Sequence, residues 1–270
     1  MIDNLRARQS NDKSLGQHFL NNDEVLDRII ELAEINPQDV ILEIGPGPGV
    51  LTDRLLQENK QLTCIELDAG VCEFLRDTFP NLDLQEGDAL ESNWINATKF
   101  ISNLPYQISS PIIEKITQKK SIDYAVILVQ EEFAQRLVVE LSSDRGSLGM
   151  CTKLDWECSM DIRVAPNCFT PSPQVNSRLV TMRRRDPPEN SKLTKLLIRQ
   201  AFGERRKKLR NTLSRAPKRI SRVKGWHSSN YKDAIQSIDF HKFSERPEDL
   251  EIEDWLELSR LLEESRRAMG

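Results

Sequence analysis

Val40-Ile41-Leu42-Glu43-Ile44-Gly45-Pro46-Gly47-Pro48-Gly49 is the stretch of sequence that decides the fold. Its apolar start predicts a buried strand, and the amphipathic residues 50–58 after it predict a helix. Between the two, Gly45, Gly47 and Gly49 permit a tight turn that a ligand can approach closely, at the electropositive N-terminus of the helix. The stretch therefore predicts the first strand-turn-helix unit of a nucleoside-binding parallel sheet.

A dinucleotide site is the alternative for this turn. The dinucleotide fingerprint is Gly-x-Gly-x-x-Gly, whereas the third glycine here comes one residue early. Glu43 also stands directly before the turn, where its carboxylate could organise the loop or meet a cationic amino-acid group of a ligand. Both details favour a ligand other than a dinucleotide.

Short apolar runs alternate with helical patterns from about residue 23 to residue 141. The pattern predicts strands at 40–43, 62–66, 82–85, 100–102 and 124–129. It predicts helices at 23–34, 50–58, 69–78, 111–118 and 131–141. This alternation is typical of the α/β class with a doubly wound, mostly parallel sheet.

The pattern changes after about residue 141. Strict alternation over 154–164 predicts a long half-buried strand, and 177–183 predicts a second one, so that the pair forms an antiparallel hairpin that closes the sheet. We expect Phe169 to be exposed in the loop between them. Residues 184–190 are the best linker candidate, and the apolar spacing beyond them predicts a small all-α domain. We therefore expect one domain over 1–185 and a second over 186–270.

Composition limits the possible classes of protein. With 38% hydrophobic and 30% charged residues, the 270-residue chain fits a soluble globular protein. No apolar run approaches the roughly 20 residues that cross a bilayer, and the polar N-terminus shows no secretory signal, so we expect a cytoplasmic protein. Five cysteines without C-x2-C spacing and only three histidines indicate reduced thiols and no metal centre.

The net charge of −4 hides a strongly basic region. Between Arg183 and Lys224 there are 16 Lys and Arg residues against three acidic ones. A solvated helix face is the plain explanation of most basic runs. Because Glu204-Arg205-Arg206-Lys207-Lys208-Leu209-Arg210 lies near the expected domain junction, we favour contact with a nucleic acid.

Two acidic residues follow later strands of the predicted sheet. Glu66 ends the second strand, where a carboxylate can hold both hydroxyls of a ribose. Asp88, in Gly87-Asp88-Ala89-Leu90, is placed for the exocyclic amine of a cofactor adenine. An ordinary strand-end Glu and a turn or cap Asp are the alternatives, and the joint spacing favours the ligand-binding roles.

Asn103-Leu104-Pro105-Tyr106 is the most specific signal of the chain. Adenine N6 is a poor nucleophile because its lone pair is delocalised into the ring. An amide oxygen and a backbone carbonyl that accept its N–H bonds would draw N6 towards a tetrahedral, nucleophilic form, while Pro105 keeps the chain turned and Tyr106 offers a stacking face. A plain Pro-Tyr turn is the alternative. Together the four motifs favour an S-adenosylmethionine (SAM)-dependent methyltransferase that acts on adenine.

The sequence resembles the rRNA adenine N6,N6-dimethyltransferase family over nearly its whole length. The strings that carry the resemblance are Lys13-Ser14-Leu15-Gly16-Gln17-His18-Phe19-Leu20, Leu42-Glu43-Ile44-Gly45-Pro46-Gly47-Pro48-Gly49, Asp88-Ala89-Leu90, Asn103-Leu104-Pro105-Tyr106-Gln107-Ile108-Ser109-Ser110-Pro111, Gln130-Glu131-Glu132, Phe169-Thr170-Pro171-Ser172-Pro173-Gln174-Val175-Asn176-Ser177, Phe202-Gly203-Glu204-Arg205-Arg206-Lys207-Lys208-Leu209-Arg210-Asn211 and Arg246-Pro247-Glu248-Asp249-Leu250.

The resemblance implies SAM-dependent dimethylation of N6 on two adjacent adenosines in the 3′-terminal hairpin of small-subunit rRNA, during assembly of the pre-30S-type particle. It implies a catalytic domain over 1–185, an RNA-contacting domain over 186–270 and a monomer. The implied SAM contacts are His18, Leu20, Gly45, Gly47, Glu66, Asp88, Ala89 and Asn103. The implied target-base site is Asn103, Leu104, Pro105 and Tyr106, with Phe169 as a second stacking face. The implied RNA contacts are Arg205, Arg206, Lys207, Lys208 and Arg210.

The sequence departs from the family at two places. Arg145 occupies a loop position where an aromatic residue is common, so an RNA-facing aromatic is replaced by a cation, and His18 stands where Asn is common. Two rival functions stay open: an enzyme of the related class that methylates large-subunit rRNA, and a non-catalytic RNA-binding factor that keeps the SAM contacts. The basic motif and the C-terminal tail argue against the first, and the intact Asn103 and Tyr106 argue against the second.

Overall fold

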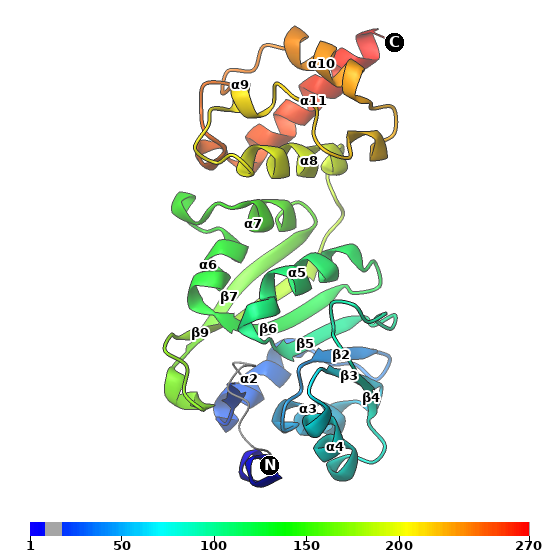
Figure 1. Cartoon of the computed structure of the whole chain (residues 1–270), viewed down its shortest axis with the longest axis vertical. Coiled ribbons are helices and arrows are strands. Elements are labelled where there is room, and N and C mark those ends of the chain that lie inside the picture. Colours follow the sequence, from blue (N-terminus) through cyan, green and yellow to red (C-terminus); the bar gives the residue numbers. More distant parts are fainter. Residues whose placement is uncertain (9–17, 270) are drawn as a thin grey trace. The chain divides into compact units, whose positions relative to one another are not determined.

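Residues 1–8 and 18–269 are described in the computed structural model of the chain (Figure 1). They divide into two compact units, the first comprising Met1–Ala134 and Glu157–Arg184, the second Gln135–Trp156 and Arg185–Gly270. This differs from the simple division after residue 185, because residues 135–156 also belong to the second unit. Their apolar side chains Val139, Met150 and Leu154 are buried in the same core as the C-terminal helices.

The first unit is built on a seven-stranded sheet with the order β4-β3-β2-β5-β6-β9-β7. Its strands are β2 (Ile41–Ile44), β3 (Leu62–Glu66), β4 (Asp83–Glu86), β5 (Lys99–Asn103), β6 (Tyr124–Gln130), β7 (Trp156–Val164) and β9 (Ser177–Arg184). β2 to β6 are parallel, and β9 runs antiparallel to β6, with Tyr124 opposite Arg183. The predicted fold class is confirmed, including the two long strands that extend the parallel sheet at one edge.

The helices of this unit follow the predicted positions closely. They are α2 (Asp23–Ala33), α3 (Val50–Glu58), α4 (Ala69–Thr78), α5 (Ser109–Gln118) and the first half of α6 (Glu131–Val138), whose residues from Gln135 onward belong to the second unit. Asn22 caps α2 by accepting a hydrogen bond from the backbone nitrogen of Val25 over 2.9 Å. α6 ends three residues before its predicted end, because Val139 takes a left-handed backbone conformation with φ of 57°.

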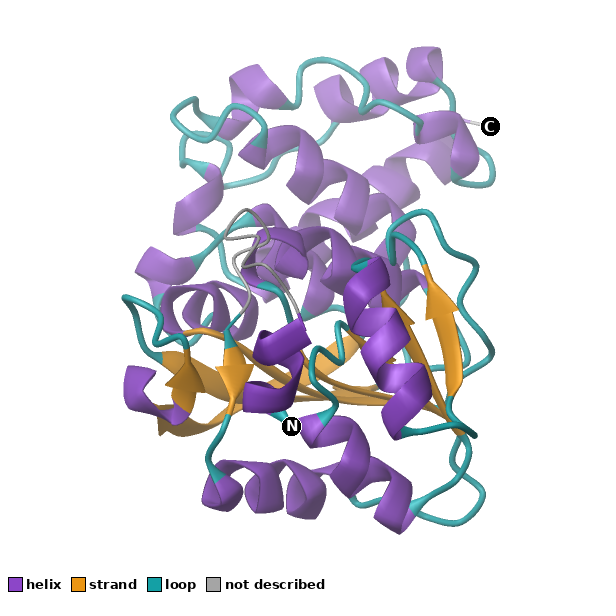
Figure 2. Cartoon of the chain, turned by 60° about the horizontal axis from the view of Figure 1, so that its bottom comes forward, coloured by secondary structure: helices purple, strands orange, loops and turns teal. Residues whose placement is uncertain are grey.

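Both faces of the sheet are covered by helices (Figure 2). On β6, Val126 and Leu128 belong to the core that also holds the apolar side of α2. The alternate residues Ala125 and Ile127 point to the opposite face and are equally buried. A strand without a solvent-facing side explains why residues 124–129 are apolar throughout.

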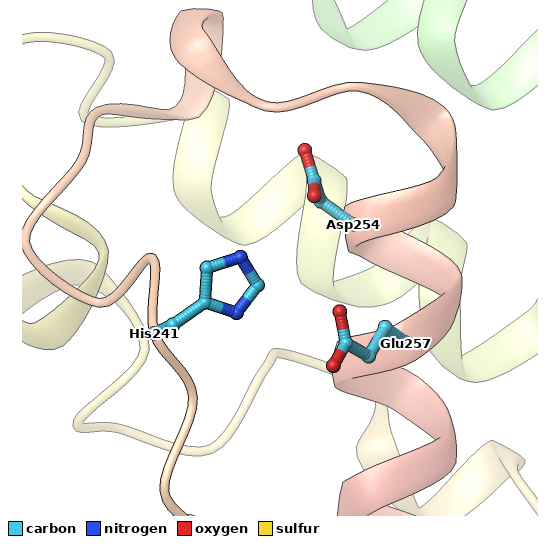
Figure 3. A group of neighbouring side chains, drawn as sticks. All are labelled: His241, Asp254 and Glu257. Carbon is cyan, nitrogen blue, oxygen red and sulfur yellow. The ribbon is translucent and has the colours of Figure 1, made fainter.

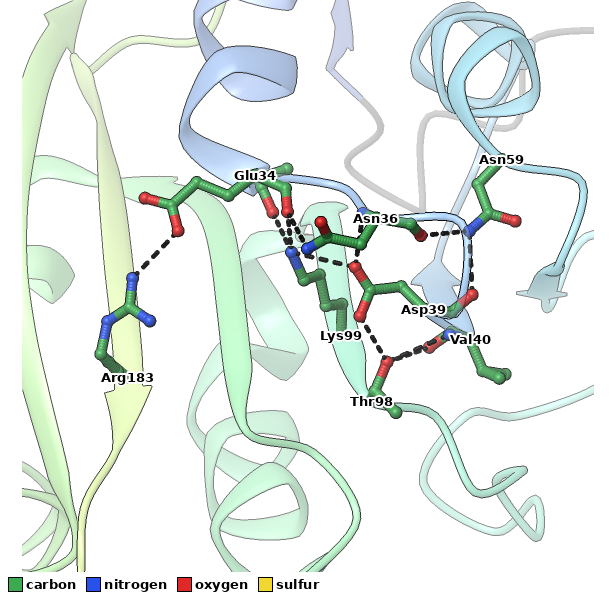
Figure 4. Close-up of polar contacts among 9 residues, drawn as sticks. Glu34, Asn36, Asp39, Val40, Asn59, Thr98, Lys99 and Arg183 are labelled. Atoms are coloured by element: carbon green, nitrogen blue, oxygen red, sulfur yellow. Dashed lines mark hydrogen bonds and ion pairs between the residues drawn. The ribbon is translucent and has the colours of Figure 1, made fainter.

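A buried lysine ties the end of α2 to the starts of β2 and β5 (Figure 4). Lys99 is 7% exposed, and its ammonium donates to the carbonyl oxygens of Ala33 and Glu34 at the C-terminus of α2. Its nitrogen also lies 3.1 Å from a carboxylate oxygen of Asp39. A cation at a helix C-terminus satisfies carbonyls that have no partner within the helix. The contact fixes the edge of the sheet opposite to the strand carboxyl ends.

Short elements surround this sheet. Helix α1 (Ile2–Arg8) begins the chain, and β1 (Phe19–Leu20) pairs with β8 (Phe169–Thr170) in a separate two-stranded sheet. Of the expected Lys13–Leu20 motif, residues 13–17 lie outside the described residues. The remaining part, from His18 onward, is described.

The second unit is helical. Its helices are α7 (Ser147–Thr152), α8 (Ser191–Phe202), α9 (Leu209–Thr212), α10 (Ser228–Ser237) and α11 (Ile252–Met269). Tyr231, Trp255 and Leu258 are fully buried at its centre. Helix α7 was not predicted, and the alternating strand starts at Trp156 rather than at residue 154, because Leu154 packs in the helical core. Over residues 1–8 and 18–269, no helix combines the length and apolar character that crossing a membrane requires.

Arg145, at the loop position where the family commonly has an aromatic residue, is held by contacts within the second unit. Its side chain is largely buried, at 8% exposed, and one guanidinium nitrogen donates to the carbonyl oxygen of Glu248 over 3.0 Å. The other terminal nitrogen forms an ion pair with Glu251. Arg145 therefore closes a contact within the second unit, with the segment that precedes α11.

Candidate active site

One cavity of about 290 Å³ lies at the carboxyl ends of the parallel strands. Gly45 and Gly47 follow β2, Glu66 ends β3, Asp88 follows β4 and Asn103 ends β5, and all five line the cavity. Ligands of open α/β sheets bind in the crevice outside these strand ends. The volume is near the lower limit for small-molecule pockets. The four motifs that are separated in sequence therefore form one site.

Most of the predicted cofactor and base residues line this cavity. In addition to the five above, they are His18, Ala89, Leu104, Pro105 and Tyr106. Leu20 and Phe169 do not line it. Sequence reasoning missed the residues Phe19, Ile44, Ile65, Leu67, Gly87, Gln107 and Ile108. Several of these are apolar neighbours of predicted residues, which suit the flat apolar faces of a purine.

The glycine turn is packed against two other parts of the site. Gly45 has a φ of +66°, and a Cβ built on it would lie 2.9 Å from Pro105. Gly47 has a φ of +54°, and its Cβ would lie 2.8 Å from the ring of Phe19. A side chain at either position would strain the backbone and displace a lining residue. The glycines thus bring the turn into contact with the Asn-Leu-Pro-Tyr segment.

Glu66 is buried and organises the floor of the cavity. Its Oε2 accepts from the backbone nitrogen of Gly47 over 3.2 Å, and its Oε1 accepts from Leu67 and Asp68 over 2.8 and 3.0 Å. Burial raises the pKa of this carboxyl, and the three backbone donors oppose that rise. A carboxylate has about four lone-pair sites, so the three donors leave it capacity for a ligand hydroxyl.

Glu43 is a supporting residue and does not line the cavity. It is 2% exposed, and its Oε2 accepts from the hydroxyl of Thr52 over 2.7 Å. The thiol of Cys64 lies 3.4 Å from the same oxygen. Burial raises the pKa of Glu43 to about 7, and the nearby charge of Glu66 adds to the rise while Thr52 and Cys64 oppose it. These partners lie on α3 and β3 and not in the glycine turn, so Glu43 joins β2 to its two neighbours, and neither of its two predicted roles is shown by a direct contact.

Asp88 is exposed at the rim of the cavity. Its Oδ1 accepts from the backbone nitrogen of Leu90 over 2.8 Å. Lys115 of α5 holds the following loop, because its ammonium donates to the carbonyl oxygens of Ala89, Leu90 and Ser92 over 2.8, 2.9 and 2.7 Å. No sequence motif points to this lysine, since its partners are backbone atoms. It positions the turn that carries Asp88.

Asn103 has one end of its amide fixed. Its Nδ2 donates to the backbone carbonyl oxygen of His18 over 3.1 Å. A carbonyl accepts but does not donate, so the nitrogen must face His18 and the amide oxygen is the other end. Among the described residues, no donor to this Oδ1 is recorded. An acceptor is thus available at the end of β5 in the cavity.

Tyr106 is held at both its hydroxyl and its ring. The hydroxyl lies 2.7 Å from the hydroxyl of Ser177 on β9. Its ring stacks with the imidazole of His18, with centroids 5.6 Å apart and planes inclined by 29°. The Nδ1 of His18 lies 2.8 Å from the carbonyl oxygen of Pro171, so it must carry a hydrogen. Tyr106 therefore stands in a fixed orientation beside the amide of Asn103.

Phe169 is not exposed, contrary to expectation. Its side chain is 2% exposed and lies in the same core cluster as Leu20, which is 3% exposed. The two residues are opposite each other in the β1–β8 pair. This pairing turns both side chains into the core, so Phe169 offers no free face to a base and the side chain of Leu20 offers none to a cofactor. Their predicted roles are therefore not supported by the geometry.

The predicted RNA contacts lie in the second unit and are all exposed. Arg205 pairs with Glu248, Lys207 pairs with Glu204, and Arg210 donates to the hydroxyl of Ser244. For Arg206 and Lys208 no ion pair is recorded among the described residues. Three of the five cations are therefore engaged within the protein.

His241, Asp254 and Glu257 are brought together in the second unit, with potential ligand atoms within 4.8 Å of one another (Figure 3). However, Asp254 already accepts from the ammonium of Lys242 over 2.6 Å and from the backbone nitrogen of Glu251 over 2.8 Å. The second bond satisfies a donor at the start of α11. Helix capping and an ion pair thus account for Asp254.

The site fits a nucleoside cofactor. Glu66 places an acceptor for ribose hydroxyls deep in the cavity, and Asp88 places one for an exocyclic amine at its rim. Ile44, Ile65 and Leu67 supply apolar surface between them. A doubly wound sheet with these acceptors at its strand ends defines a SAM-dependent methyltransferase.

The chain belongs to the ribosomal RNA adenine dimethylase family, whose model matches residues 8–233. It is 35% identical over 261 residues to a probable ribosomal RNA small subunit methyltransferase A of Thermococcus kodakarensis, covering 93% of this chain and 92% of that protein. It is 34% identical to the ribosomal RNA small subunit methyltransferase A of Fusobacterium nucleatum, covering 93% and 97%. It is therefore a SAM-dependent rRNA adenine dimethyltransferase.

Solved structures agree with this assignment. A dimethyladenosine transferase from Plasmodium falciparum is 27% identical and superimposes with a TM-score of 0.72, covering 92% of this chain and 98% of that one. The 23S rRNA methyltransferase ErmE, at 24% identity and a TM-score of 0.69, has the same fold.

Proposed function

We propose that this enzyme dimethylates N6 of two adjacent adenosines in the 3′-terminal hairpin of small-subunit rRNA, within a pre-30S-type particle during assembly. The observation that carries the proposal is the free amide oxygen of Asn103 beside the oriented ring of Tyr106. The relatives named as small subunit methyltransferases support the choice of RNA. We further propose that the enzyme acts as a cytoplasmic monomer.

In this proposal the cavity holds SAM through residues from four strand ends. Glu66 accepts from the ribose hydroxyls, Asp88 accepts from the adenine amine, and His18, Gly45, Gly47 and Ala89 border the remainder. When bound, SAM supplies an electrophilic methyl group. The glycine turn brings backbone close to the ligand, and Glu66 holds that turn in place through the nitrogen of Gly47.

Asn103 and Tyr106 prepare the target base. The amide oxygen of Asn103 and the carbonyl oxygen of Leu104 accept the two N–H bonds of N6, which localises its lone pair. Tyr106 stacks on the ring and holds N6 in line for transfer. The methylated N6 cation is acidic enough to lose its proton to solvent, so no side chain is needed as a strong base. Because Asn103 is neutral, it can accept again from the monomethylated amine.

Mapping the methylated adenosines tests the proposal. The purified chain with SAM is given small-subunit particles that lack the modification, and large-subunit rRNA in a parallel reaction. Dimethyladenosine at two adjacent positions of the small-subunit hairpin is expected. Product only in large-subunit rRNA would favour the resistance-type methyltransferase, and SAM binding without product on either RNA would favour the non-catalytic factor.

A further inference from the structure

Residues 213–226, here called the basic loop, carry five cations and no acidic residue. The cations are Arg215, Lys218, Arg219, Arg222 and Lys224, and all five side chains are exposed. The loop connects α9 to α10 and contains only one short 3-10 turn, Ile220–Arg222. The five positive charges are therefore exposed to solvent on a segment that is mostly neither helix nor strand.

The first part of the basic loop is held by hydrogen bonds from two helices. The buried hydroxyl of Tyr231 on α10 donates to the carbonyl oxygen of Leu213 over 3.0 Å. The side-chain nitrogen of Gln200 on α8 donates to the carbonyl oxygens of Thr212 and Arg215 over 3.1 and 3.4 Å. These contacts fix the backbone while leaving the cationic side chain of Arg215 outside.

The far end of the basic loop is fixed by α11. The indole nitrogen of Trp226, which is buried, donates to a carboxylate oxygen of Glu263 over 2.9 Å. Gly225 adopts a φ of +82°, and a Cβ built on it would lie 2.9 Å from the guanidinium of Arg266. In between, Ile220 is 3% exposed and anchors the middle. The backbone of the basic loop is therefore held at both ends and in the middle.

For the cations of the basic loop, no ion pair is recorded within the described part of the chain. Arg205 and Lys207 in the preceding basic motif do form recorded ion pairs. Arg215 is close enough to Glu204 to contribute, after Lys207, to the lowering of the pKa of that carboxyl. The basic loop therefore adjoins the motif and extends its positive charge. Of the ten cations in the motif and the basic loop together, the five of the loop have no ion pair recorded among the described residues, whereas two of the five in the motif do.

We propose that the basic loop is a phosphate-binding surface that contacts the RNA backbone and contributes more to RNA affinity than the Arg205–Arg210 motif does. The proposal rests on the proposed function, which supplies the RNA. A fixed backbone with unpaired cations suits a regularly spaced polyanion, because binding then costs no loop ordering. A membrane surface is disfavoured, because none of the large apolar side chains exposed in the described chain falls within residues 213–226.

The salt dependence of RNA binding tests this surface. The full chain carrying Lys218→Gln, Arg222→Gln and Lys224→Gln is titrated with a small-subunit rRNA transcript at several salt concentrations. Each lost phosphate contact removes about 0.7–0.9 units from the log–log slope, so a decrease of about 2–3 units is expected. Arg219 is left unchanged because its φ of 66° makes a substitution there harder to interpret.

A matched variant separates specific contact from loss of net charge. Lys60→Gln, Arg76→Gln and Lys120→Gln remove three exposed cations of the first unit and should leave the slope near that of the wild type. In the described part of the chain no ion pair is recorded for Lys60 or Lys120, whereas Arg76 pairs with Glu86 over 3.0 Å. An equal change in both variants would overturn the proposal, and so would loop-dependent binding to anionic phospholipid vesicles without loop-dependent binding to RNA. The wild type also tests the proposed function, which fails if the wild type methylates no rRNA. If the wild type methylates rRNA and the loop variant has an unaltered salt slope, only the proposal that the basic loop binds phosphates is contradicted.

Discussion

The side-chain nitrogen of Asn103 donates to the backbone carbonyl oxygen of His18 over 3.1 Å. These residues are far apart in sequence, yet the bond decides which end of the amide faces the candidate base site. The ring of His18 also stacks on Tyr106, the other residue assigned to the base. One residue from the N-terminal segment therefore positions two residues of the Asn-Leu-Pro-Tyr segment.

Replacing Asn103 by Ala should remove the acceptor for N6. Loss of one preorganised hydrogen bond of this kind lowers kcat by about 10²–10³-fold. We expect the first methylation to be nearly abolished while RNA binding persists, because the predicted RNA contacts lie in the second unit. Mass spectrometry of product nucleosides measures the effect. Dimethyladenosine at normal yield from Asn103→Ala would contradict the role of this amide as the acceptor for N6.

Tyr106 should matter more for the second methyl transfer than for the first. A monomethylated amine has one N–H bond left to hold, so its position depends more on stacking. Tyr106→Ala should accumulate monomethyladenosine, whereas Tyr106→Phe keeps the aromatic face and loses only the contact with Ser177. The ratio of mono- to dimethyladenosine decides it. The same ratio in both variants would argue against stacking as the cause.

Much of this site could be predicted because it is encoded locally. The end of each parallel strand follows an apolar run in the sequence, so Gly45, Glu66, Asp88 and Asn103 could be assigned to one sheet edge before their distances were known. Topology then requires that the carboxyl ends of neighbouring parallel strands lie together. The prediction depended on strand order more than on side-chain detail.

The parts that could not be predicted depend on tertiary contacts. Phe169 looks like a loop residue, but its pairing with Leu20 buries it. Lys115 and Lys99 bind backbone carbonyls, which leave no trace in the residue pattern. Residues 135–156 belong to the helical unit, and Leu154 is buried in the core of that unit. The alternation of apolar and polar residues shows that Leu154 is buried but does not show in which of the two cores.

Glu66→Ala should weaken SAM binding. Loss of a hydrogen-bonded charged group costs about 2 kcal/mol or more, which is roughly 30-fold in affinity. The backbone nitrogens of Gly47, Leu67 and Asp68 would also lose their acceptor. Isothermal calorimetry measures the change, with Glu66→Gln as the variant that retains an acceptor and should lose less. Unchanged SAM affinity in Glu66→Ala would defeat the assignment.

Within the basic motif, the cations without recorded partners should contribute most to RNA binding. Arg206→Ala with Lys208→Ala should lower the log–log salt slope by about 1.4–1.8 units. Arg205→Ala with Lys207→Ala should lower it less, because these side chains must first leave Glu248 and Glu204. SAM affinity should be the same in both variants. The reverse order of the two slopes would show that the internal ion pairs do not restrain the cations.

Glu43 should make the enzyme less stable as the pH rises towards neutrality. Its pKa is raised by burial to about 7 in the folded state, from an ordinary value of 4.5. Below pH 4.5 the carboxyl is protonated whether the chain is folded or not. Between these values the unfolded chain releases the proton while the folded chain retains it, so the stability contributed by the neutral carboxyl is lost as the pH rises and is gone above about 7.

Comparison with Glu43→Gln isolates this contribution, because glutamine keeps an oxygen that can accept from Thr52 and does not titrate. The free energy of unfolding of the wild type should fall relative to that of Glu43→Gln by on the order of 3 kcal/mol between pH 4.5 and pH 7.5. Urea unfolding at a series of pH values measures both curves. Glu66, whose pKa is raised in the same direction mainly by burial, is present in both proteins, so its own titration cancels and only its electrostatic coupling to Glu43 stays in the difference. Parallel curves would mean that Glu43 has the same pKa in the folded and the unfolded chain, and that Thr52, Cys64 and local solvent compensate its burial.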